Sequence, residues 1–167
     1  RILEEIYLTT FRSCIERGGS KSLMTSYNSI NGSPSSANDW LLNKKLKGDM
    51  KFRGFTISDA GAVGGANVLH YTAGDYEAAT VHAMMNGADV IFQTAYDHHR
   101  LFIPPFLDGR INKKVIDSAV ARVLRVKFEL GLFDHPYVDE KAALSANQKK
   151  ENATIARTAA RESIVLL

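Results

Sequence analysis

The sequence predicts an α/β protein built on a parallel sheet. Apolar runs rich in strand-forming residues occur at 22–27, 54–59 and 88–93, and segments with helical periodicity lie between and after them. Parallel strands need long crossover connections, which these helical segments supply. Hydrophobic residues make up 45% of the chain and charged residues 23%, as in a folded globular protein rather than a disordered or fibrous chain.

An amphipathic helix is expected at the start of the chain, because apolar side chains recur there at three- and four-residue spacing and Gly18-Gly19 ends the pattern. Cys14, the single cysteine, excludes an internal disulfide and a Cys-based zinc site, and its place in this pattern predicts a buried thiol. The recurring positions are Ile2, Leu3, Ile6, Tyr7, Phe11, Cys14 and Ile15.

The next elements follow as strand, loop and helix. The apolar run at 22–27 reads as a buried strand, and the segment 28–37 is rich in Asn, Gly, Ser and Pro, which favour loops. Asn38 is suited to cap a helix, which we expect to end at Gly48.

A second strand and a second helix repeat this order. The run at 54–59 is bounded by glycine and ends on a carboxylate, and a glycine-rich loop follows at 60–66. A helix is expected at about 75–86, with Gly87 as its stop, before the third strand at 88–93.

The last third of the chain does not continue this alternation of strands and helices. It begins with a helix that has Pro104-Pro105 near its start and a long helix at about 113–130. The segment 134–147 has few periodic apolar residues and resembles an interdomain linker. A helix at about 148–161 and a terminal strand at 163–167 are expected after it.

Composition excludes several classes of function. The net charge of +3 comes from 21 basic and 18 acidic residues scattered along the chain, so no basic stripe for nucleic acid is predicted. No run approaches the roughly 18 apolar residues of a membrane span, so no membrane partner is expected. His98 and His99 beside Asp97 lack the spacing of a metal site, and we expect no metal.

The C-terminal ends of the predicted strands are the expected place for chemistry, because functional groups of parallel α/β sheets gather there. Tyr27 with Asn28, Ser58 with Asp59, and Gln93 occupy these ends. Asp59 is the strongest candidate, since an acid between an apolar strand and a loop of small residues is open to a substrate. The same position also suits a carboxylate that caps the next turn or pairs with a nearby base.

Five segments, in order, resemble glycoside hydrolase family 3. They are MTSYNSING at 24–32, ANDWLL at 37–42, FRGFTISDAGAV at 52–63, IDSAVARVLRVKFELGLF at 116–133 and ARTAARESIVLL at 156–167. The resemblance implies a partial (β/α)8 barrel of TIM type, made of its last three β/α units, plus the start of an α/β sandwich domain. A complete barrel takes about 250 residues. The implied domains are 1–133 for the barrel part, 134–147 for the linker and 148–167 for the start of the second domain.

The resemblance also implies the site residues and the reaction. Asp59 matches the family's catalytic nucleophile in a retaining, exo-acting β-glycosidase that hydrolyses terminal β-linked glucose or xylose without a cofactor. Tyr27 matches the tyrosine beside the reactive sugar. Met24 and Asn28 are further candidates for the substrate pocket, and so is His70 in the loop after the nucleophile. Methionine in a strand is more often plain packing, and a loop histidine is more often a surface residue.

Two features limit what the resemblance implies. The family often has Trp after the nucleophile as a platform for the sugar, whereas this chain has Ala60. The family's sugar-gripping residues lie on earlier barrel strands and its general acid lies elsewhere, so the N-terminal barrel half and the second domain are expected partners of this chain. Its ligand would be an oligosaccharide or a β-glycoside.

Other functions remain open at this stage. A β-N-acetylglucosaminidase of the same family is one alternative. A catalytically inactive structural fragment is another, and its uncovered strand edges would favour aggregation or pairing. A nucleotide-binding α/β module is a third, although the loop at 60–65 matches no phosphate-binding fingerprint and an acid precedes it. Secretion or periplasmic export fits a polysaccharide-degrading parent, but no residue indicates it.

Overall fold

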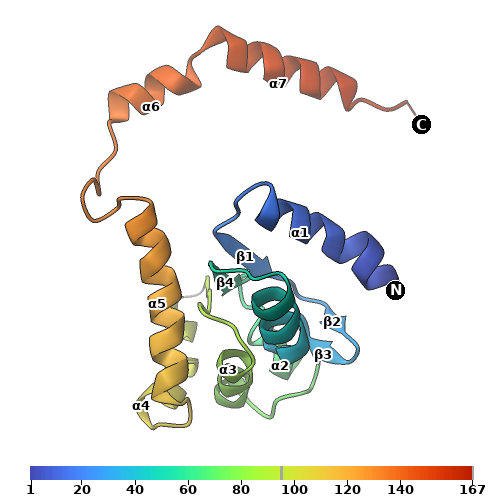
Figure 1. The fold of residues 1–167 in the computed structure, drawn as a ribbon, viewed down its shortest axis with the longest axis vertical. Helices are drawn as coiled ribbons and strands as arrows, with labels where there is room; N and C mark the ends of the chain where they lie inside the picture. Colours follow the sequence, from blue (N-terminus) through green and yellow to red (C-terminus); the bar gives the residue numbers. More distant parts are fainter. Residues whose placement is uncertain (95, 167) are drawn as a thin grey trace. The chain divides into compact units, whose positions relative to one another are not determined.

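The computed structural model divides the chain into two compact units, Arg1–Glu129 and Leu130–Leu167 (Figure 1). The structure describes residues 1–94 and 96–166, without the side chain of residue 96. Within these residues, no helix is both long enough and apolar enough to cross a bilayer.

A parallel pair of strands forms the centre of the first unit. Strand β1 (Ser22–Thr25) pairs with β4 (Phe55–Ser58), with Ser22 opposite Phe55 and Thr25 opposite Ser58. The two strands lie side by side in Figure 1. This pairing, joined by a long crossover, confirms the α/β class and the first two predicted strands, each slightly shorter than its apolar run.

The third predicted strand, 88–93, is wrong as an element. The structure has only a single parallel bridge there, between Ile57 and Val90. On both sides of this bridge, a backbone N–H that would bond a backbone carbonyl in a regular sheet bonds a side-chain oxygen instead. The Asp89 carboxylate accepts from Thr56 N at 2.8 Å, and Phe92 N donates to Ser58 Oγ at 2.9 Å. The chain therefore runs beside β4 without a repeating backbone ladder.

The predicted loop at 28–37 contains a small hairpin. Strands β2 (Ser29–Ile30) and β3 (Ser33–Pro34) are antiparallel and are joined by Asn31 and Gly32. Both joining residues have positive φ, 52° and 80°, which is the backbone of a type I′ turn and suits the Asn-Gly pair.

Helices supply most of the first unit. The predicted cap at Asn38 forms, because its Oδ1 accepts from Leu41 N at 3.0 Å. The helix expected at about 75–86 is capped by Asp75, whose Oδ1 accepts from Ala78 N at 2.7 Å. The helix predicted to end at Gly48 continues to Asp49. The α-helices are α1 (Leu8–Glu16), α2 (Gly65–Val68), α3 (Tyr76–Met85), α4 (Pro104–Leu107) and α5 (Lys113–Glu129). The π-helical segments η1 (Leu3–Tyr7) and η3 (Trp40–Asp49) and the 3-10 segments η2 (Ser35–Ala37) and η4 (Tyr96–Leu101) complete the set.

Two separate apolar clusters make up much of the core of the first unit. One joins α1 and η3 through Leu8, Leu42 and Leu46, with Leu23 of β1 packed against it. The other contains Val63, Ala79, Ala83 and Phe102, and the ring of Phe102 lies 5.4 Å from that of Tyr76. The predicted burial of Cys14 is wrong, because α1 turns Leu8 and Ile15 inward and leaves the thiol exposed.

A buried cluster of charged side chains ties the helices to β4. The Asp89 side chain is fully buried, and its Oδ1 accepts from Lys47 Nζ at 3.1 Å and from Arg122 Nη2 at 2.6 Å. Its Oδ2 accepts from Thr56 N of β4. Desolvation lowers the pKa of Lys47 below its ordinary value even though Asp89 opposes that shift. The cluster therefore joins η3, β4 and α5.

The second unit is helical throughout its regular part. Helix α6 (Glu140–Asn147) lies inside the segment predicted as a linker, and α7 (Lys150–Glu162) follows it. Asp139 explains the extra helix, since its Oδ1 accepts from the N–H groups of Lys141 and Ala142. The predicted terminal strand is not formed over Ile164–Leu166, where no strand of the described residues pairs with it. Leu167 lies outside the described residues.

We predict that Asp89→Ala destabilises the first unit by about 3–5 kcal/mol, because it leaves Lys47 and Arg122 partly buried without their shared carboxylate. Urea unfolding of the chain would measure this. Asp117→Ala is the matched control, since Asp117 is 58% exposed and pairs with Lys113 on one helix face, and it should cost less than about 0.5 kcal/mol. Equal losses in the two variants would contradict the role of Asp89.

Candidate functional site

The candidate site lies where β1 and β4 end. Asp59 directly follows β4, and its backbone N–H donates to Thr25 O of β1 at 3.1 Å. Its carboxylate is held by the next peptide, because Ala60 N donates to Asp59 Oδ1 at 2.7 Å. The side chain is only half-buried. The strand pair therefore presents a fixed carboxylate that a ligand can reach.

Tyr27 comes from the end of the neighbouring strand and lies beside Asp59. Its hydroxyl donates to Ala60 O at 2.7 Å, and 47% of the residue is exposed. Partial desolvation, and then the adjacent Asp59 carboxylate, raise the pKa of the Tyr27 hydroxyl above its ordinary value. The hydroxyl therefore stays protonated at neutral pH and is a hydrogen-bond donor next to the carboxylate.

His70 joins the same group through the backbone. Its ring Nε2 lies 2.7 Å from Tyr27 O, although 43 residues separate the two in sequence. The loop that follows Asp59 thus folds back over the end of β1. The structure brings together three predicted residues, Asp59, Tyr27 and His70, from three segments of the chain.

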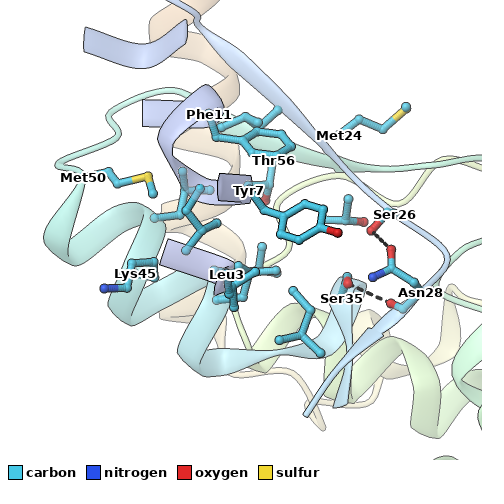
Figure 2. A pocket seen from close by; sticks show the side chains of 17 residues that line it. Leu3, Tyr7, Phe11, Met24, Ser26, Asn28, Ser35, Lys45, Met50 and Thr56 are labelled. Atoms are coloured by element: carbon cyan, nitrogen blue, oxygen red, sulfur yellow. Dashed lines mark hydrogen bonds between the residues drawn. The ribbon is translucent and has the colours of Figure 1, made fainter. Parts of the chain in front are cut away.

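Met24 and Asn28 lie along a different hollow. They line an apolar cavity of about 590 Å³ between α1, β1 and η3, whose lining includes none of Asp59, Tyr27 and His70 (Figure 2). Figure 2 shows the Asn28 amide engaged locally, with Ser26 Oγ donating to Asn28 Oδ1 at 2.5 Å. The part that these two residues play toward a substrate stays a prediction.

Small residues shape the loop after Asp59. Gly61 has φ of 74°, which favours glycine, and its N–H donates to Phe92 O at 3.1 Å. At Gly64 a Cβ atom would lie 2.7 Å from Tyr76 Cε1, so only glycine lets the loop pack on that ring. These two positions of the loop therefore require glycine, one for its backbone conformation and one for its packing.

The site has the groups for nucleophilic or electrostatic chemistry at an electron-poor carbon. A carboxylate is positioned by one peptide N–H, and a protonated phenol lies beside it. Within the described residues, no three or more His, Cys, Asp or Glu side chains are grouped to hold a metal ion.

The chain belongs to glycoside hydrolase family 3. The family model described as "Glycosyl hydrolase family 3 N terminal domain" matches residues 1–126, which include the whole candidate site. This is the family that the sequence motifs predicted.

The curated relatives include β-glucosidases and β-xylosidases. A periplasmic β-glucosidase of Salmonella typhimurium is 33% identical over 96% of this chain and 21% of its own length. Beta-D-xylosidase 1 of Arabidopsis thaliana is 33% identical over 79% of this chain and 17% of its own length. The chain thus spans about a fifth of the length of the curated relatives that it matches.

Solved structures agree with this assignment. A β-glucosidase from Erythrobacter marinus has a TM-score of 0.84 and 35% identity, over 96% of this chain and 21% of its own. A β-glucosidase from Listeria innocua, solved in complex with glucose, has a TM-score of 0.80 and 35% identity, over 100% of this chain and 23% of its own.

The buried Asp89 cluster is the feature that the sequence reasoning missed. One signal was present, since Asp89 lies inside an apolar run, and a buried carboxylate there needs charged partners. Its partners, Lys47 and Arg122, lie 42 and 33 residues away, and no spacing rule connects them.

We predict that Gly64→Ala destabilises the first unit by about 1–3 kcal/mol, because the new methyl group would press on the packed ring of Tyr76. Thermal unfolding would measure the change. Gly74→Ala is the control, since a Cβ atom at Gly74 has nothing within 4 Å. A Gly64 variant as stable as the Gly74 variant would show that the loop can move aside at no cost.

Proposed function

We propose that this chain carries the catalytic nucleophile of a retaining, exo-acting β-glycosidase, and that Asp59 is that nucleophile. The observation that carries the proposal is the place of Asp59 at the end of β4, fixed by Ala60 N and next to the protonated Tyr27 hydroxyl. The substrate would be a terminal β-linked glucose or xylose. No cofactor is needed for this reaction.

The reaction would proceed through a covalent intermediate. The Asp59 carboxylate attacks the anomeric carbon and forms a glycosyl ester, while a general acid protonates the departing glycosidic oxygen. The same group then takes a proton from water, which attacks the anomeric carbon, releases the sugar and regenerates Asp59. Two inversions retain the configuration. The second group would stand about 5–5.5 Å from the nucleophile.

Tyr27 would act on the nucleophile and the sugar together. Its hydroxyl donates to the carbonyl of Ala60, the residue after Asp59, and would turn to the Asp59 carboxylate when the sugar ester breaks down. His70 would position Tyr27 through its contact with the Tyr27 carbonyl. Met24 and Asn28 would bind substrate only if the pocket extends along the edge of β1.

The rest of the longer protein would complete the site. We propose that 1–133 forms the C-terminal part of a (β/α)8 barrel, that 134–147 links the domains, and that 148–167 begins an α/β sandwich domain. The chain covers about a fifth of its relatives, so the general acid and the other sugar-binding groups would come from the remaining segments. By itself the chain would be inactive.

The comparisons favour glucose or xylose over the other functions that the sequence left open. The named relatives are β-glucosidases and β-xylosidases, and the Listeria innocua structures include complexes with glucose and laminaribiose. N-acetylglucosaminidase and nucleotide-binding functions gain no support from them. Ala60 in place of an aromatic platform leaves the choice between the two sugars to other residues.

We predict that a 2-fluoro β-glucosyl fluoride labels Asp59 in the full-length protein. The 2-fluoro substituent slows both formation and breakdown of the glycosyl ester, whereas the reactive fluoride leaving group speeds formation alone, so the ester accumulates. Intact mass spectrometry and peptide mapping would locate the label. The 2-fluoro xylosyl reagent tests the second sugar in the same way.

A chemical rescue separates the nucleophile from a merely nearby acid. Asp59→Ala should lower kcat/KM at least about a thousand-fold, and added azide should restore turnover and give the α-glycosyl azide, since only one inversion then occurs. Asp134→Ala, an exposed acid of the second unit, is the control. A label on another residue would overturn the assignment of Asp59.

We predict that Tyr27→Phe lowers kcat about ten-fold or more with a smaller effect on KM, because the lost hydroxyl lies at the carbonyl of Ala60, next to the nucleophile, rather than along the bulk of the substrate. Steady-state kinetics on an aryl β-glucoside would measure both constants. Tyr137→Phe, which alters a 92% exposed tyrosine, is the matched control. An unchanged kcat for Tyr27→Phe would remove the hydroxyl from the mechanism.

A further inference from the structure

We infer that Gln93 binds the substrate and helps to select it, as a hydrogen-bond donor at the edge of the Asp59 site. The inference rests on the proposed glycosidase function and extends it by one residue. Gln93 ends the third apolar run, so it occupies the same edge of the strand layer as Tyr27 and Asp59.

The backbone of Phe92, directly before Gln93, hydrogen-bonds to residues that precede and follow Asp59 in the sequence. Phe92 N donates to Ser58 Oγ at 2.9 Å, and Phe92 O accepts from Gly61 N at 3.1 Å. One of these bonds reaches the residue before Asp59, and the other reaches the loop after it. The position of Gln93 relative to Asp59 is therefore set by backbone geometry rather than by a long side chain.

The Gln93 amide has a defined orientation. Its Oε1 accepts from Thr94 N at 3.0 Å, and a peptide N–H can face only the carbonyl oxygen of an amide. That bond turns Nε2 away from the peptide. Across the described residues, no hydrogen bond of Nε2 is present, so this nitrogen has two hydrogens to offer to a ligand.

Glycine leaves the space beside this amide open. The Cβ position at Gly61 lies 3.9 Å from Gln93 Oε1, and Gly61 holds φ of 74°. A side chain there would fill the gap between the amide and the loop that carries Asp59. Gly61 and Ala60 thus place no bulky side chain next to the Gln93 amide on the side of this loop.

A carboxamide fits a sugar hydroxyl, which can accept from Nε2 and donate elsewhere. A site that offers such a donor discriminates against a substrate that lacks the hydroxyl, because the amide is then left unpaired. With Ala60 there is no aromatic ring directly after the nucleophile to orient the sugar by stacking. A polar contact from the adjacent strand end would supply orientation in its place.

The test compares Gln93→Ala with the unmodified full-length enzyme on an aryl β-glucoside and its monodeoxy analogues. We expect kcat/KM for the parent glucoside to fall about ten-fold. One deoxy analogue lacks the hydroxyl that Gln93 bonds. For that analogue, kcat/KM of the variant and of the unmodified enzyme should differ less than two-fold. Gln148→Ala changes the chain's only other glutamine, which is exposed in the second unit, and should change neither value.

A second variant keeps the shape of the side chain. Gln93→Glu should move the acidic limb of the kcat/KM profile to higher pH, because a negative charge near Asp59 favours its protonated form. Equal losses on the parent glucoside and every deoxy analogue, or an unchanged pH profile, would overturn the inference. If the unmodified enzyme hydrolyses neither β-glucosides nor β-xylosides, the proposed function itself fails, and the inference fails with it.

Discussion

The bonding of the buried Asp89 carboxylate is the constraint on which the first unit depends. Its two oxygens accept from Lys47 of η3, from Arg122 of α5 and from the backbone of Thr56 in β4. A fully buried carboxylate is tolerated only when such partners surround it, so these three elements can assemble in one arrangement. Over the described residues, the sheet of β1 and β4 has two strands and supplies little cooperativity of its own.

The charged cluster and the candidate site lie toward opposite ends of the short strand β4. Thr56 bonds Asp89, and three residues later Asp59 is presented with its carboxylate half-exposed. This separation lets one end of the strand layer be rigid and closed while the other stays open for a ligand, as in α/β enzymes generally. At the open end the Tyr27 hydroxyl and the His70 ring each bond a backbone carbonyl, that of Ala60 and that of Tyr27.

Sequence patterns predicted most helices and the first two strands well, because capping residues and apolar spacing act locally. Asn38 forms the cap that its position suggested, and the helix expected at about 75–86 begins at the cap of Asp75. The wrong predictions arise from contacts that apolar spacing alone does not show. At 88–93 the side chains of Asp89 and Ser58 replace ladder bonds, and at 140 the cap at Asp139 starts a helix in a segment with little apolar periodicity. Cys14 belongs to an apolar pattern, yet only one side of α1 is covered.

The sequence by itself determined the class of protein and its principal candidate residue, since the segments around Tyr27 and Asp59 are specific enough to identify glycoside hydrolase family 3. The tertiary structure decided which of the candidate residues stand together. It joined His70 to Tyr27, placed Met24 and Asn28 along a separate apolar cavity, and brought Lys47 and Arg122 onto Asp89. Local patterns fix what each segment prefers, whereas these contacts join segments 33 to 43 residues apart, and only packing and the need to bond buried polar groups bring such segments together.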